Sequence, residues 1–99
     1  MKIDFYDPEM CCSTGVCGPA PDPELIRVEE MIEDLKAQGH TVARHMPSRD
    51  SAAFTANQEI YEIVAIKGMR ALPIVTVDGV ICKMGRYPQI DELHTAGEH

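Results

Sequence analysis

The stretch L-P-I-V-T-V-D-G-V-I-C-K-M, residues 72–84, combines a proline, two strand patterns and a turn. The β-branched run that follows Pro73 predicts a strand. The Asp78-Gly79 dipeptide predicts a two-residue hairpin turn, because that turn needs residues that tolerate positive φ. The run V-I-C-K-M is then the partner strand. These residues therefore predict an antiparallel hairpin in the second half of the chain.

The first half of the chain begins with a predicted strand and a predicted helix. Residues 2–6 alternate apolar and polar side chains, which indicates a short strand. Asp22 before Pro23 is typical of a helix start, and Gly39 suits the end of that helix. Apolar positions recur within it at helical spacing: Leu25, Val28, Ile32 and Leu35. The rest of its surface is acidic and is interpreted as a solvated face: Glu29, Glu30, Glu33 and Asp34.

A second strand and two further helices complete the predicted elements. Residues 41–46 predict a strand, and a helix is expected from Asp50 or Ser51 through Ile66. The core candidates of that helix are Phe54, Ile60, Ile63 and Val64. A short last helix is expected from Pro88, with Ile90 and Leu93 inside it.

The order of these elements, β-α-β-α-β-β-α, predicts an α/β fold with a four-stranded mixed sheet flanked by helices. Strand, helix and strand imply a parallel pair with a right-handed crossover, and the hairpin adds an antiparallel strand. This is the topology of a thioredoxin-like fold, in which a cysteine loop follows the first strand and a cis-proline begins the third. Leu72-Pro73 stands at the matching place, so we expect a cis bond at Pro73, close to the cysteines.

Size and composition limit the classes of function. A chain of 99 residues suits a single domain, residues 1–99, that needs no disulfide or metal to fold. No apolar run approaches the roughly 20 residues of a membrane span. The first residues carry acids where a secretory signal would be apolar, so we expect a cytoplasmic protein with reduced thiols. The net charge of −7 argues against nonspecific binding to nucleic acid, without excluding a basic patch on a dimer.

Three of the four cysteines lie in the stretch M-C-C-S-T-G-V-C-G, residues 10–18. A thiol-disulfide enzyme is one interpretation, but the spacing is not C-x-x-C. No cation that would lower a thiol pKa occurs between Lys2 and Arg27. A zinc site is another, but it would need a fourth ligand from Cys82 or a distant histidine. Cys82 itself is interpreted as a buried core residue.

A trivalent metalloid fits three clustered thiols better. Arsenic(III) and antimony(III) are soft and three-coordinate, and soft thiolates select soft centres. Gly15 permits positive φ, which lets the loop curl so that Cys17 can approach Cys11 and Cys12. The residues alone thus favour metalloid binding while leaving the redox and zinc alternatives open.

The sequence resembles the ArsD family of arsenic metallochaperones. The resemblance is carried by D-P-E-M-C-C-S-T-G-V-C-G at residues 7–18, by Leu72-Pro73 and Asp78-Gly79, and by G-R-Y-P at residues 85–88. It implies a thioredoxin-like fold and, by motif match, Cys11, Cys12 and Cys17 as the metalloid ligands.

The same resemblance implies a carrier and not an enzyme. Family members receive As(III) or Sb(III) from thiols such as glutathione and deliver it to the ArsA ATPase, which drives arsenite efflux. They also act as weak repressors of the ars operon, typically as dimers, so a homodimer and operator DNA are further expected partners. Some relatives carry extra cysteine pairs near the C-terminus, and this chain lacks them.

Overall fold

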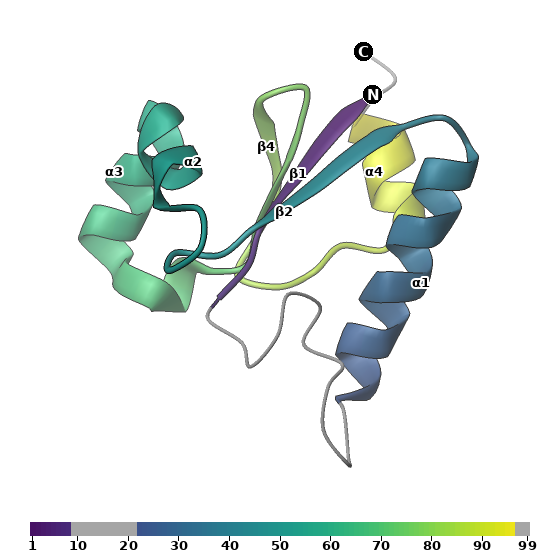
Figure 1. Cartoon of the computed structure of the whole chain (residues 1–99), viewed down its shortest axis with the longest axis horizontal. Helices are drawn as coiled ribbons and strands as arrows, with labels where there is room; N and C mark the ends of the chain where they lie inside the picture. The colour runs from purple at the N-terminus through teal and green to yellow at the C-terminus, as the bar shows by residue number, and fades with distance from the viewer. Residues whose placement is uncertain (9–21, 97–99) are drawn as a thin grey trace.

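The computed structural model of the chain describes residues 1–8 and 22–96 (Figure 1). In chain order the described elements are β1 (Lys2–Tyr6), α1 (Pro23–Ala37), β2 (Thr41–His45), α2 (Ser51–Ala56), α3 (Gln58–Lys67), the 3-10 turn η1 (Gly68–Ala71), β3 (Ile74–Val77), β4 (Val80–Met84) and α4 (Ile90–Ala96). No helix within these two ranges is both long enough and apolar enough to cross a membrane.

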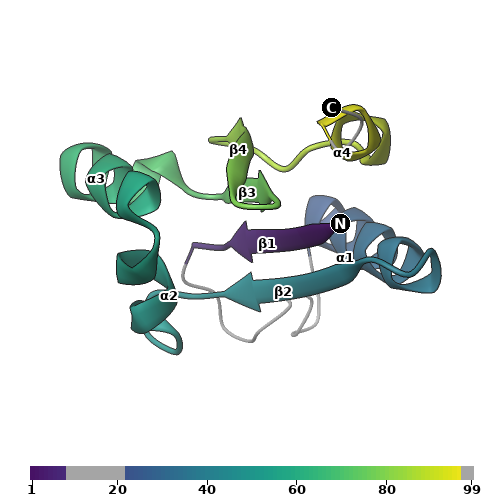
Figure 2. The ribbon, with the colours of Figure 1, turned by 90° about the horizontal axis from the view of Figure 1, so that it is seen from above.

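The four strands form one mixed sheet in the order β2-β1-β3-β4. Strand β1 runs parallel to β2 and antiparallel to β3, and β4 pairs antiparallel with β3. Helices α1 and α4 lie on one side of the sheet, and α2 and α3 lie on the other (Figure 2). The predicted four-stranded sheet flanked by helices, in a thioredoxin-like arrangement, is therefore confirmed.

The Leu72-Pro73 bond is cis, as the position of this dipeptide in the topology predicted. Its expected closeness to the cysteines concerns Cys11, Cys12 and Cys17, which lie outside the described residues. The hairpin that follows is also as predicted. Asp78 and Gly79 both have positive φ, at 52° and 86°, between β3 and β4.

Helix α1 begins and ends as its sequence predicted. The Asp22 carboxylate accepts a hydrogen bond of 2.8 Å from the backbone N–H of Glu24, and Pro23 occupies the first turn. Gly39 follows the helix with φ at 93°, a conformation that side chains disfavour. The buried face of α1 consists of Val28, Met31, Ile32 and Leu35.

The predicted helix from residue 50 or 51 through residue 66 is wrong as a single element. It is divided into α2 and α3 at Asn57, whose backbone is extended, with φ at −101° and ψ at 107°. The Asn57 side chain accepts hydrogen bonds from the backbone N–H groups of Glu59 and Ile60, at 3.1 and 3.3 Å. Asparagine favours this capping position over a helix interior, so it starts a new helix here.

Two apolar clusters lie on opposite faces of the sheet. The first joins Ile3 and Phe5 of β1 to α1 and α4, and its other buried members are Val28, Met31, Ile32, Leu35, Val75, Val77, Tyr87 and Leu93. The second joins β1 and β3 to α2 and α3 through Tyr6, Phe54, Ile60, Ala71, Leu72 and Ile74. Ile63 and Val64 pack at its margin. Of the four predicted core residues of the second helical region, Phe54 and Ile60 are therefore buried in this core, whereas Ile63 and Val64 are only partly buried against it.

Candidate functional site

The predicted ligands Cys11, Cys12 and Cys17 lie outside the described residues, but the structure describes both places where their segment joins the fold. The chain leaves the described part after Pro8, which follows β1, and re-enters it at Asp22, the cap of α1. We call this end of the sheet the β1 carboxyl edge. It also contains the end of β2 and the start of β3, because Tyr6 pairs with His45 and with Ile74.

Asp7 fixes the chain at this edge. Its side chain is completely buried and accepts two hydrogen bonds from the Arg44 guanidinium, at 2.9 Å from Nε and 3.1 Å from Nη2. The Tyr87 hydroxyl donates a third, at 2.6 Å. The Asp7 backbone N–H donates to the carbonyl of His45 at 2.8 Å. The residue that begins the cysteine motif is thus held by β2 and by the segment after β4.

Arg44 extends this network to α1. Its Nη1 lies 3.2 Å from a Glu29 carboxylate oxygen, and only 13% of its side chain is exposed. Burial opposes the charge of the guanidinium, but the hydrogen bonds and charge of Asp7 outweigh it and raise the pKa of Arg44. One largely buried cation therefore connects the residue after β1 with β2 and α1, and Glu29 is not part of a purely solvated face.

Tyr87 supplies a physical role for the G-R-Y-P motif. Its ring lies 6.2 Å from that of Phe5, centroid to centroid, in the α1–α4 core. Burial, together with the nearby Asp7 carboxylate, raises the pKa of Tyr87 far above its ordinary value, so its hydroxyl stays a donor. From the sequence alone this motif has no assigned structural role beyond the family resemblance. In the fold its tyrosine hydrogen-bonds to the D-P motif eighty residues earlier.

An open pocket of about 440 Å³ lies beside this network. It is lined by Glu24, Arg27, Pro73, Gly85, Arg86 and Tyr87. Arg27 donates to the Pro88 carbonyl at 3.1 Å and pairs with Glu24, and this pairing with Glu24 chiefly raises the pKa of Arg27. Gly85 has φ at 87°, and its N–H donates to the carbonyls of Ala71 and Pro73. The pocket brings together the start of α1, the cis-proline and the G-R-Y-P segment.

Cys82 lies away from this edge, on β4 at the margin of the α1–α4 core. It is half-buried, and its sulfur lies 3.7 Å from the Glu92 carbonyl oxygen. Burial, followed by the charge of Glu92, raises the pKa of the thiol, which disfavours a thiolate ligand. No group of three or more histidine, cysteine and acidic residues within residues 1–8 and 22–96 is arranged to hold a metal.

The histidine nearest the edge, His45, is engaged in a separate network. Its Nε2 lies 3.0 Å from Asp4, its Nδ1 lies 2.5 Å from Asp50, and its ring packs against Tyr6. Burial opposes protonation, but the hydrogen bonds with Asp4 and Asp50 prevail and raise the pKa of His45. This side chain therefore links β2, β1 and the start of α2.

Comparison with known proteins places nearly the whole chain in a family. The model of a family described as "Arsenical resistance operon protein ArsD" matches residues 1–98. The chain belongs to the ArsD family. The resemblance carried by the cysteine, Leu72-Pro73 and G-R-Y-P motifs is thereby confirmed.

Two relatives of the ArsD family come from Escherichia coli, and both are named "Arsenical resistance operon trans-acting repressor ArsD". One is 34% identical over 91 residues, covering 92% of this chain and 76% of the relative. The other is 34% identical over 88 residues, covering 89% and 73%. The crystal structure of an arsenical resistance operon trans-acting repressor from Bacteroides vulgatus is similar, with a TM-score of 0.85 and 38% identity. The structural match covers 96% of this chain and 90% of the Bacteroides vulgatus chain.

Proposed function

We propose that this protein is a cytoplasmic, non-enzymatic carrier of As(III) or Sb(III) that binds the metalloid through Cys11, Cys12 and Cys17. It receives the metalloid from glutathione or another thiol and passes it to an ArsA-type efflux ATPase. The observation that carries the proposal is the ArsD family match over residues 1–98, which includes the three-cysteine motif. Three thiols suit a soft three-coordinate centre.

Transfer proceeds by stepwise thiol exchange. In each step an incoming thiol forms one As–S bond while one As–S bond to a cysteine of this chain breaks. The proton of the incoming thiol passes to the departing sulfur, so no free arsenite is released. Asp7, held by Arg44 and Tyr87, fixes one anchor of the cysteine segment, and the Asp22 cap fixes the other. The chain contributes geometry and sulfur and needs no general base.

Transfer is tested with the full chain loaded with one equivalent of As(III) and a purified ArsA-type ATPase. At limiting arsenite the loaded protein is expected to stimulate ATP hydrolysis more than the same amount of arsenite alone. A variant with all three motif cysteines replaced by serine is the matched control. Equal stimulation by the loaded protein and by free arsenite would exclude a carrier role.

The ligand set is tested by mass spectrometry and calorimetry. One metalloid per chain is expected, with weaker retention in Cys11→Ser, Cys12→Ser and Cys17→Ser and unchanged retention in Cys82→Ser. Arsenous acid is neutral and releases water on condensing with thiols, so binding should liberate few protons, whereas zinc must expel the thiol protons. Loss of binding in Cys82→Ser alone would contradict the assignment.

We also propose weak, metalloid-relieved repression of an arsenical resistance operon by a homodimer. The names of the relatives favour this second function. The net charge of −7 opposes contact with phosphates and limits affinity at physiological salt. An operator fragment should shift in a gel with the apo protein and be released by As(III). Catalysed reduction of a model disulfide would instead support the thiol-disulfide oxidoreductase alternative.

A further inference from the structure

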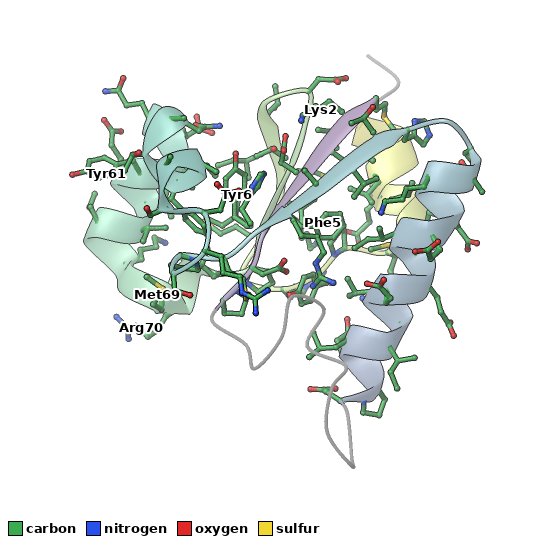
Figure 3. All side chains as sticks on the ribbon, in the orientation of Figure 1. Lys2, Phe5, Tyr6, Tyr61, Met69 and Arg70 are labelled. Carbon is green, nitrogen blue, oxygen red and sulfur yellow. The ribbon has the colours of Figure 1, made fainter. Side chains whose placement is uncertain are left out.

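Two exposed cations lie together on a protein whose net charge is −7. Lys67 ends α3 and Arg70 lies in η1, and both are exposed. Neither forms an ion pair with any residue in the ranges 1–8 and 22–96. Figure 3 shows Arg70 with Met69 at the C-terminal end of α3. This corner therefore presents positive charge that the described part of the fold does not use.

Apolar side chains are exposed beside these cations. Ile66 is 83% exposed, Met69 is 51% exposed and Met84 is 41% exposed. A hollow of about 440 Å³ lies between the end of α3, η1 and the end of β4. It is lined by Lys67, Arg70, Ala71, Met84 and Gly85. We call Ile66, Lys67, Met69, Arg70 and Met84 the α3–β4 patch. An exposed apolar centre with a cationic rim is typical of interaction surfaces, where methionine and arginine are enriched.

The α3–β4 patch lies at the β1 carboxyl edge. Met84 pairs with Ile74, and Ile74 pairs with Tyr6, the last residue of β1. The hollow and the pocket beside Tyr87 also share Gly85 as a lining residue. A partner bound to this patch is therefore placed at the same edge as the two anchors of the cysteine segment.

The composition of the patch favours an acidic protein surface as its occupant. Lys67 and Arg70 form no ion pair within the described residues, so negative charge on a partner would complement them, and the hollow accepts an inserted apolar side chain. Nucleic acid would neutralise Lys67 and Arg70 but would leave Ile66 and Met69 without apolar contacts. An anionic bilayer gains about 1 kcal/mol for each cation near its surface, a small gain against the net charge of this chain.

We propose that the α3–β4 patch docks the protein that receives the metalloid, through an acidic surface of that protein that carries an apolar side chain. The identity of this partner rests on the proposed function, whereas the location and chemistry of the patch rest on the described residues. Docking at this edge holds the acceptor beside the anchors at Asp7 and Asp22.

The test measures the concentration of As(III)-loaded protein that gives half-maximal stimulation of a purified ArsA-type ATPase. Lys67→Glu and Arg70→Glu should each raise this concentration about three- to tenfold at low salt, and less at high salt. Ile66→Ser should raise it by a similar factor that is insensitive to salt. The matched control is Lys36→Glu, which makes the same charge change in the last turn of α1, at the end of that helix opposite the Asp22 cap. It should leave the half-maximal concentration nearly unchanged. Metalloid content by mass spectrometry should be equal in all variants.

Two outcomes separate this inference from the proposed function. If the wild-type chain does not stimulate the ATPase, the proposed function fails. If it does, and the patch variants behave like Lys36→Glu, only the docking site is overturned. Binding of operator DNA or of phosphatidylserine vesicles is measured with the same variants. A loss there, with ATPase stimulation intact, would assign the patch to nucleic acid or membrane and overturn the proposal.

Discussion

Replacing Tyr87 by phenylalanine removes one hydroxyl group and leaves the ring against Phe5. The lost hydrogen bond is 2.6 Å long and ends on the Asp7 carboxylate, which is completely buried. Hydrogen bonds to charged groups contribute about 1.5–3 kcal/mol. Asp7 keeps both hydrogen bonds from Arg44, so the cost stays below the roughly 3–5 kcal/mol of breaking a buried ion pair. Tyr87→Phe should therefore destabilise the fold by about 2 kcal/mol.

The measurement is urea unfolding at neutral pH, with the slope m expected to stay unchanged. For a chain of this size the loss corresponds to a decrease in Tm of roughly 10 °C. Tyr61→Phe is the matched control, because Tyr61 is 53% exposed and its loss of a hydroxyl should cost less than about 0.5 kcal/mol. In the Asp7→Asn background the cost of Tyr87→Phe should shrink. Equal effects of Tyr87→Phe and Tyr61→Phe would refute the buried hydrogen bond.

Three further predictions concern other parts of the fold. The pKa of His45 is raised by Asp4 and Asp50 in the folded chain, so its stabilisation is fully present below about pH 6.5 and lost as the pH rises through the folded value. The difference in free energy of unfolding between wild type and His45→Asn should thus decrease from pH 6 to 8.5. A difference that stays constant over this range would contradict the stabilisation of protonated His45 by Asp4 and Asp50. Asn57→Ala should cost about 1 kcal/mol in urea unfolding and Asn57→Asp much less, because aspartate also caps; equal costs would argue against capping. The Cys82 thiol should react slowly with iodoacetamide at pH 7 in the native chain and rapidly in urea, since burial raises its pKa. Equal rates would contradict the packing of this side chain.

Local patterns were sufficient to predict most of the fold. Asp22-Pro23 and Asp78-Gly79 act through backbone conformations that depend on near neighbours, so their roles could be inferred from the sequence. The division at Asn57 could not be predicted in this way, because asparagine is tolerated inside helices and the apolar spacing continues across it. Only the extended backbone of Asn57 and its two capping hydrogen bonds distinguish two short helices from one continuous helix.

The candidate site was predictable only where its residues are adjacent in the chain. The three cysteines stand out because they lie within seven positions. The Asp7–Tyr87 contact joins residues eighty positions apart, and spacing carries no information about such a pair. For Arg44 the sequence offers only a weak indication of a buried ion pair. It is a cation two positions after Val42 in β2, so it lies on the same face of the strand as that partly buried residue. Its pairing with Asp7 and Glu29 required the register of β1 against β2.

The central position of β1 has a consequence for protein synthesis. This strand is synthesised before one of its two neighbours, β3, and before Tyr87, whose hydroxyl bonds to Asp7 eighty residues earlier. At translation rates of about 5–20 residues per second, the eighty residues between Asp7 and Tyr87 take roughly 4–16 s to make. During that interval the nascent chain exposes one unpaired side of β1. The β3 side of β1 is therefore completed only after α1, β2, α2 and α3 have been synthesised.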